Sequence, residues 1–213
     1  MIKRNLTLAF RVFLKHPLSS FITLIGLATG IGCFLVLALY VFDEYRTDRF
    51  HGNYENIYHV DMKYYVDGEP MFSIPPPSGL FNDLANIEGL MLGSRAFSPR
   101  EVQVNVGQHR FVESGLTFVD SSWVDIFDFR YQNPSYSFLK DPSVIAISET
   151  MAKKYFNSLD IIGESMIVDK EIYTVGNVIL NNDANSSLEI NFLVAYEKRR
   201  TLGVDLDSYE SGH

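Results

Sequence analysis

The longest apolar run in the chain extends from Phe21 to Phe42 and contains no Asp, Glu, Lys, Arg or His. Thirteen of its 22 residues are Leu, Ile, Val or Phe. A helix of that length is about 33 Å long at about 1.5 Å per residue. The hydrocarbon core of a bilayer is about 30 Å thick, and a helix satisfies its own backbone polar groups there. The pattern therefore predicts one membrane-spanning helix, over residues 20–42.

Residues 3–15 show a different pattern, with apolar side chains at spacings of three and four. This spacing places the apolar side chains on one face of a helix. Such a helix lies in the headgroup plane, where anionic lipid attracts basic side chains. The pair His16-Pro17 ends it, because proline disfavours helix in the residue before. We therefore predict a cytoplasmic amphipathic helix within residues 1–19, and its membrane-surface contacts are four basic residues: Lys3, Arg4, Arg11 and Lys15.

Two other interpretations of the N-terminal region remain open. Residues 1–42 have the charged start and apolar stretch of an export signal, although the apolar run is longer than usual and no small-x-small site follows Phe42. A lipoprotein signal ending at Cys33 is a second alternative. It has Gly30 where an aliphatic residue is expected, and nine further apolar residues follow the cysteine. Otherwise Cys33 acts as a small hydrophobic residue.

Four small residues lie within the apolar run. Gly26 and Gly30 form a GxxxG motif, and Ala28 and Gly32 continue a small-residue pattern. Small residues let helix backbones approach closely in lipid, although glycine is also generally common in transmembrane helices. We predict a helix-packing face here, which implies partner helices that this sequence does not supply.

Charge is distributed unevenly on the two sides of the apolar run. The chain has 18 Lys and Arg and 26 Asp and Glu, and its net charge is −8. Four basic and no acidic residues precede Asp43, so residues 43–213 carry 14 basic and 26 acidic side chains, a net charge of −12. Because basic residues concentrate on the cytoplasmic side, the N-terminus is expected in the cytoplasm and residues 43–213 outside the cell membrane, in the periplasm. The acidic balance argues against nucleic acid as a partner.

The segment that follows the apolar run is rich in charged residues and histidines. Charged residues between Asp43 and Arg49 are expected to cap the helix and to pair at its end. A metal site is the alternative, but His51 and His59 are eight residues apart and no carboxylate is placed to complete a ligand set.

The remainder of the chain alternates short strands with short helices. Val102, Val104 and Val106 alternate with polar residues, as in a half-buried strand. The expected strands are 58–66, 91–97, 101–106, 111–119, 144–147, 165–168, 172–179 and 188–196. This mixture predicts an α+β domain over residues 43–213.

Turn and cap residues set the bounds of several of these elements. Asp67-Gly68 and the region of Asp169-Lys170 are expected turns. Ser148 is expected to cap a helix over 149–156, and Ser78 one that begins near residue 80. An aromatic cluster forms a helical turn on the sheet and consists of Trp123, Phe127 and Phe129. Residues 183–187 are either a substrate loop or an ordinary polar loop.

Familiar catalytic motifs are absent from the sequence. It contains no GxxxxGK[ST], HExxH, GxSxG or CxxC pattern. The five histidines are scattered, and the acidic residues are spread over expected turns and strand edges. We therefore expect no catalytic residue, no metal and no bound cofactor, and we do not expect an enzyme.

Four segments resemble one family when they are taken in order. They are residues 5–60, with the GLATGIGC span and DEYRTDRFH; 118–129, FVDSSWVDIFDF; 139–156, LKDPSVIAISETMAKKYF; and 161–179, IIGESMIVDKEIYTVGNVI. Together they are similar to the N-terminal portion of MacB-type, FtsX-like ABC transporter permeases of the Bacteroidota type. The matching portion comprises the first transmembrane helix and the periplasmic core domain.

The resemblance implies a role in transport. Permeases of this kind pair with an ABC ATPase subunit, and they pass ATP-driven helix motion to the periplasmic domain, a process called mechanotransmission. Their substrates include drugs, peptides, toxins and lipoproteins. By this resemblance ATP is bound by a partner subunit, and the other expected partners are membrane lipid, further transmembrane helices and a periplasmic adaptor.

The sequence departs from the family pattern in one respect. Three further transmembrane helices and the cytoplasmic loop between the second and third are not present in these 213 residues. We therefore expect an N-terminal, truncated portion of a permease with an incomplete core domain. Two functions follow as hypotheses: a permease subunit of an export or mechanotransmission complex, or a single-span anchored periplasmic binding or sensor module without an ATPase.

Overall fold

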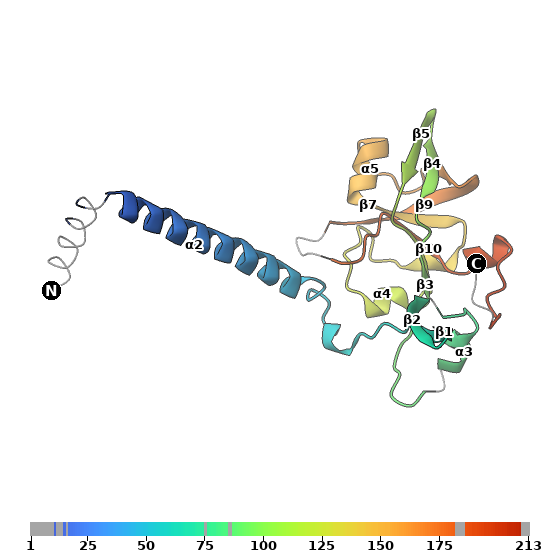
Figure 1. Cartoon of the computed structure of the whole chain (residues 1–213). Helices are drawn as coiled ribbons and strands as arrows, with labels where there is room; N and C mark the ends of the chain where they lie inside the picture. Colours follow the sequence, from blue (N-terminus) through green and yellow to red (C-terminus); the bar gives the residue numbers. More distant parts are fainter. Residues whose placement is uncertain are drawn as a thin grey trace. The chain divides into compact units, whose positions relative to one another are not determined.

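The computed structural model describes residues 11, 15, 17–74, 76–84, 87–181 and 186–209 (Figure 1). The chain divides into two compact units, Met1–Thr47 and Asp48–His213. The first contains the apolar helix, and the second contains the sheet.

The apolar helix α2 extends over Pro17–Arg46 and has 30 residues. Proline is well suited to its first position, because the missing N–H has no intrahelical partner there. None of the helix residues is buried within the chain. Among the described residues this is the one helix long and apolar enough to cross a membrane. It begins three residues before the predicted span and continues four residues past Phe42.

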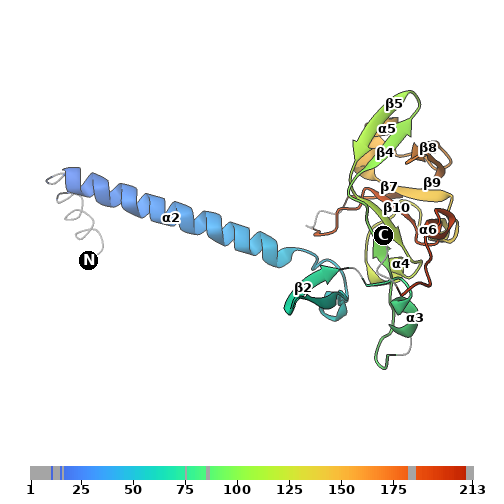
Figure 2. The same ribbon diagram turned by 45° about the vertical axis from the view of Figure 1, so that its right-hand side comes forward.

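An eight-stranded mixed sheet organises the second unit, with strand order β3-β6-β10-β7-β9-β8-β4-β5 (Figures 1 and 2). Its strands are β3 Ala96–Phe97, β4 Val102–Val106, β5 His109–Glu113, β6 Leu116–Val119, β7 Val144–Ser148, β8 Ser165–Val168, β9 Glu171–Ile179 and β10 Phe192–Ala195. The pairs β6/β10 and β7/β9 are parallel, and the others are antiparallel. The predicted α+β class is confirmed.

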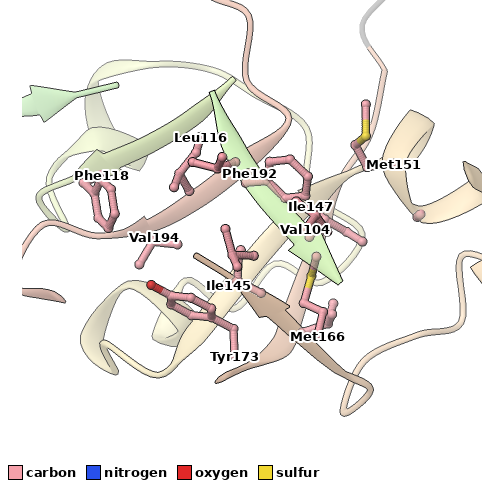
Figure 3. Close-up of a cluster of buried hydrophobic side chains, with 14 of the residues drawn as sticks. Val104, Leu116, Phe118, Ile145, Ile147, Met151, Met166, Tyr173, Phe192 and Val194 are labelled. Atoms are coloured by element: carbon pink, nitrogen blue, oxygen red, sulfur yellow. The ribbon is translucent and has the colours of Figure 1, made fainter. Parts of the chain in front are cut away.

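The strands at the centre of the sheet are buried on both faces. Every residue of β6 and β10 is buried, and so are four of the five residues of β7. On one face Ile145, Phe192 and Val194 belong to the larger core cluster (Figure 3). On the other face Val119 and Leu193 pack in a second cluster with Trp123. In β4 and β8, by contrast, buried and exposed residues alternate, as in a sheet with one solvated face.

Short helices connect and cover the strands. They are α3 Leu80–Leu84, α4 Trp123–Ile126, α5 Glu149–Phe156 and α6 Lys198–Thr201, with 3-10 turns η1 Tyr54–Asn56 and η2 Ser137–Lys140. The predicted helix α5 is confirmed with its cap, since the Ser148 hydroxyl accepts a hydrogen bond from the Met151 N–H. The predicted aromatic turn is confirmed as α4.

Both predicted turns are also present. Asp67 and Gly68 have positive φ angles and connect β1 (Met62–Val66) to β2 (Glu69–Ile74), which form a separate two-stranded sheet. Asp169 and Lys170 connect β8 to β9 in the same way.

The predicted strand over residues 111–119 is wrong, because the structure divides it into β5 and β6. Gly115 separates them with a φ of +77°, and a Cβ there would lie 3.0 Å from the backbone nitrogen of Asn191. The Gly115 carbonyl accepts hydrogen bonds from Asn191 and Phe192. This close approach turns the chain from the sheet edge at β5 to the interior position of β6.

Three other expected strands are shorter than predicted. Residues 58–66, 91–97 and 188–196 contribute only β1, β3 and β10. Met91 is 94% exposed, so its apolar character does not indicate a core strand. Near the C-terminus Leu206 is fully buried in the larger cluster, although the sequence there shows no apolar run.

Candidate functional site: the junction after the apolar helix

The residues predicted to form a helix-packing face all lie in α2. Apart from the neighbouring backbone of α2 itself, a Cβ added at Gly26, Gly30 or Gly32 would meet no described atom within 4 Å, and Ala28 is exposed. This part of the helix is therefore bare within the chain. Whether it packs against other helices stays a prediction.

The predicted membrane-surface residues are only partly described. Arg11 and Lys15 are helical and exposed. Lys3 and Arg4 lie outside the described residues, as does most of the predicted amphipathic helix.

The chain enters the sheet unit two residues after α2. Asp48 has a φ of +60°, a left-handed conformation that aspartate tolerates better than most residues. Its Oδ1 accepts hydrogen bonds from the Ser186 hydroxyl at 3.0 Å and the Ser187 N–H at 2.9 Å. The Ser187 hydroxyl donates to Oδ2. Three hydrogen bonds thus fasten Asp48 to a segment 139 positions further along the sequence.

The next anchor is His51, which is 2% exposed. Its Nδ1 accepts a hydrogen bond from the Asp128 N–H at 3.0 Å. Its ring contacts those of Phe50, Phe127 and Phe129, with centroids 3.9, 5.2 and 5.4 Å away. The imidazole is therefore part of the predicted aromatic cluster around Trp123.

A third contact joins the residue after His51 to Asp128. The Asp128 Oδ2 accepts a hydrogen bond from the Gly52 N–H at 2.6 Å. Residues 51–52 and Asp128 are thus joined by two hydrogen bonds of opposite direction, from the Asp128 N–H to His51 and from the Gly52 N–H to Asp128. We call the set of Asp48, His51, Gly52, Asp128 and the Ser186-Ser187 pair the junction.

Electrostatics at the junction favour a charged Asp48 and a neutral His51. Burial raises the pKa of Asp48, but the hydrogen bonds from Ser187 and Ser186 outweigh it and hold that pKa below its usual value. Burial lowers the pKa of His51, and the nearby Asp128 and Asp48 carboxylates offset this only in part. In the neutral imidazole the proton is on Nε2, because Nδ1 accepts a hydrogen bond.

The sequence-based expectation for Asp48 is wrong. Its carboxylate does not cap α2 but binds Ser186 and Ser187. Of the loop 183–187, residues 183–185 lie outside the described residues, while the two serines form the other half of the junction. The sequence held a partial signal, since a charged Asp48 and the aromatic pair Phe50-His51 follow the span closely. It gave no indication of the partner segment.

A second polar cluster joins residues next to β3, β6 and β10 with residues of α3 and α6. Arg95 forms a bidentate ion pair with Asp120, at 2.7 and 2.9 Å, between the rings of Phe81 and Tyr196. Arg199 stacks on Phe97 at 3.8 Å and donates to the Tyr196 hydroxyl. These groups satisfy one another, so the cluster joins segments of the fold. Across the part of the chain that the structure describes, no group of three or more His, Cys, Asp or Glu could hold a metal ion.

Most of the chain, the junction included, matches a known protein family. The family model described as the MacB-like periplasmic core domain matches residues 20–207. The chain belongs to this family. The predicted family is thereby confirmed, and both halves of the junction, including Asp128, lie within the matched region.

A solved structure has a similar fold. A crystal structure of a domain of a protein described as a permease from Porphyromonas gingivalis is 18% identical, with a TM-score of 0.54, over 66% of this chain and 60% of that chain. The likeness shows the fold, and this chain spans about 60% of that structure's length. No curated protein sequence matches.

Two more distant structures are also similar. The periplasmic region of MacB from Actinobacillus actinomycetemcomitans is 17% identical, with a TM-score of 0.45, over 55% of this chain and 53% of that chain. The extracellular domain of the noncanonic ABC-type transporter YknZ from Gram-positive bacteria is 16% identical, with a TM-score of 0.46, over 56% of this chain and 62% of that chain.

Proposed function

We propose that this MacB-like chain is a non-catalytic permease subunit of an ABC-type export complex and relays movement of α2 to the periplasmic domain. In this proposal α2 spans the inner membrane with its N-terminus in the cytoplasm, and residues 43–213 lie in the periplasm. A partner ATPase binds and hydrolyses ATP, so the chain itself needs no cofactor. Family membership and one long apolar helix support a membrane-anchored periplasmic domain.

One observation carries the relay. Helix α2 ends at Arg46, and Asp48 already accepts three hydrogen bonds from Ser186 and Ser187. Only Thr47 separates the helix from this attachment. A fully extended residue spans at most about 3.6 Å, so the link has little slack. Displacement of the helix end by more than that distance must move the junction or break it.

The route continues from the junction into the sheet. Phe127 and Phe129 contact His51 and pack in the second core cluster, which includes Leu193 of β10. Because packed cores deform little, a force on residues 48–52 is passed to the central strands.

The proposal also assigns contacts to the membrane-spanning helix and to the basic residues that precede it. Gly26, Ala28, Gly30 and Gly32 pack against partner transmembrane helices, as small residues do in lipid. Lys3, Arg4, Arg11 and Lys15 contact anionic headgroups on the cytoplasmic side.

The relay is tested by lengthening its link. A Gly-Ser-Gly-Ser insertion between Arg46 and Thr47 leaves both units intact but adds up to about 14 Å of slack. The tagged chain is purified with its partners from native membranes. Hydrogen exchange in residues 48–209 is then compared between nucleotide-free and vanadate-trapped states. We expect the unmodified chain to respond to nucleotide, and the lengthened chain to retain the ATPase subunit but lose the response.

A matched control is the same insertion after Gly107, in the exposed turn between β4 and β5. It should leave the response unchanged. A full response in the junction variant would contradict the relay. Failure of any ABC ATPase to co-purify with the unmodified chain would instead support a single-span anchored module.

A further inference from the structure

His51 is the feature of the junction that the relay does not require. An apolar residue of similar size would fill the same space among Phe50, Phe127 and Phe129. The structure instead places a titratable ring there, 2% exposed, with its Nε2 lacking a hydrogen-bond partner among the described residues. A buried polar group without a partner destabilises a fold, so its presence calls for a reason.

We propose that His51 is a proton-sensitive latch, whose protonation releases residues 48–52 from the segment at Asp128. The reason is the direction of one hydrogen bond. Nδ1 accepts from the Asp128 N–H at 3.0 Å, and a protonated imidazole has no acceptor nitrogen. Protonation therefore replaces this hydrogen bond with two N–H groups that face each other.

The surroundings of His51 favour release of its segment over burial of a protonated imidazole. The ring is enclosed by aromatic side chains, which provide no acceptor for two imidazolium protons. Two carboxylates approach it, those of Asp128 and Asp48, and both favour the charged ring. However, Asp128 Oδ2 is engaged with the Gly52 N–H, and Asp48 with Ser186 and Ser187. Arg49, two residues before His51, places its guanidinium over the Tyr54 ring.

The direction of the pH effect follows from linkage. His51 has a pKa below its usual value in the attached state, because burial penalises its charged form. Released, it recovers a pKa of about 6.5. Above that pH both states are neutral and the latch holds. As pH falls below about 6.5, the ratio of released to attached junction rises up to about tenfold per pH unit, until His51 titrates in the attached state as well.

The latch acts on the same junction through which we propose that motion passes. Its effect on transport therefore rests on the proposed function. A more acidic periplasm would open the contacts of His51 and Gly52 with Asp128, through which motion passes into the aromatic cluster, while Asp48 stays bound to Ser187. Its test needs neither an ATPase nor a transported substrate, so the two proposals fail separately.

Hydrogen exchange of the full chain in detergent micelles tests the latch. The amides of Gly52 and Asp128 form the two reciprocal hydrogen bonds, so they report opening directly. After correction for the intrinsic exchange rate, we expect their opening to increase up to about tenfold per pH unit from pH 6.5 to 5. The His51→Asn variant keeps an acceptor oxygen near the position of Nδ1 but does not titrate, so its opening should be independent of pH over this range. His109→Asn, at an exposed position on β5, should behave as the unmodified chain.

A second measurement keeps the test decisive if His51→Asn does not fold. Deuterium exchange at the imidazole C2 position gives the titration of each histidine in the unmodified chain. The titration of His51 should coincide with opening of the Gly52 and Asp128 amides. Opening that is independent of pH, or that persists unchanged in His51→Asn, or that does not coincide with the titration of His51, would overturn the proposal.

Discussion

Asp48 meets two requirements that few residues satisfy together. Its backbone is left-handed at φ +60°, and its carboxylate accepts hydrogen bonds from Ser186 and Ser187. Glycine adopts the left-handed backbone easily but has no acceptor, whereas asparagine tolerates this backbone and keeps one of the two acceptor oxygens. Substitutions at this position can therefore separate backbone strain from the loss of an acceptor.

The first prediction concerns this separation. Exchange of the Ser187 amide should increase in the order unmodified chain, Asp48→Asn, Asp48→Gly, Asp48→Ala. Asparagine keeps one oxygen, glycine removes both without strain, and alanine adds the cost of a positive φ, about 1 kcal/mol. Hydrogen exchange with mass spectrometry measures the order. Equal exchange in the unmodified chain and Asp48→Gly would show that the carboxylate does not hold this segment.

The pH dependence at Asp48 should differ from that at His51. Because the attached Asp48 has a lowered pKa, its contribution is fully present above the unfolded pKa of about 3.9 and is lost as pH falls below that value. Protection of the Ser187 amide should therefore persist at pH 5, where the latch at His51 is already opening. Simultaneous loss of both protections near pH 6 would indicate one cooperative opening instead of two separate contacts.

Asn177 is the most fully hydrogen-bonded buried side chain of the sheet. Its amide oxygen accepts from the N–H groups of Asn133 and Val178, and its amide nitrogen donates to the carbonyls of Asn133 and Ser135. It lies at the irregularity where β9 pairs with β7, next to Gly176, where a Cβ would be 2.3 Å from Val144. The side chain holds residues 133–135 against the sheet.

Removing this amide should be costly. We expect Asn177→Ala to reduce the free energy of unfolding by about 2–4 kcal/mol, because several buried backbone groups lose their partners. Urea unfolding of the full chain in detergent, followed by fluorescence of Trp123, measures the change. Gln132→Ala removes an exposed amide nearby and should alter stability by less than about 0.5 kcal/mol. Equal effects of the two substitutions would contradict the assigned role.

At the scale of elements, α5 depends on Ser148. The hydroxyl of Ser148 accepts from the Met151 N–H at 3.3 Å and donates to Asn191 at 3.2 Å. We expect Ser148→Ala to cost about 1–2 kcal/mol through the lost cap and the unpaired Asn191 oxygen. The same urea experiment measures this change. Thr150→Ala, at the exposed second residue of α5, should be neutral or slightly stabilising. A loss in Thr150→Ala as large as that in Ser148→Ala would reject the cap as the cause.

Elements with a local signal were predictable from the sequence. Helix α5 had its cap serine, and the β8/β9 hairpin had two strands around a short turn. The strands β5 and β6 were not separable in this way. In residues 111–119 Glu113, Ser114 and Gly115 separate two apolar segments, but the turn at Gly115 depends on the approach of Asn191, 76 positions away. The burial of Leu206 likewise comes from tertiary packing.

The junction was predictable from one side only. The polar and aromatic residues after the apolar run pointed to a special segment, and the aromatic cluster at Trp123 was expected. The pairing of Asp48 with Ser187 joins segments 139 positions apart, and nothing in either segment specifies the other. Hydrogen bonds between distant loops depend on where the sheet brings those loops, which local patterns do not encode.

At the scale of the molecule, the distribution of charge around the apolar run predicts the orientation of the chain in the membrane. The four basic residues before Asp43 and the net charge of −12 over residues 43–213 lie on opposite sides of the apolar run Phe21–Phe42 in the sequence. A cleaved export signal would have the same early pattern, but the mature chain would then lack Arg11 and Lys15. Intact mass of the purified chain distinguishes the two cases. We expect residues 11 and 15 to be retained.

Orientation can be measured with single cysteines. Ser137 is exposed at the start of η2, and Lys15 is exposed before α2, so both tolerate substitution. In a Cys33→Ala background, Ser137→Cys should react with a membrane-impermeant thiol reagent in intact spheroplasts. Lys15→Cys should react only after lysis, because positive charge is retained in the cytoplasm. Labelling is read as a mass shift on the purified chain. Protection of Ser137→Cys in intact cells, or labelling of Lys15→Cys there, would reverse the orientation and place the junction on the cytoplasmic side.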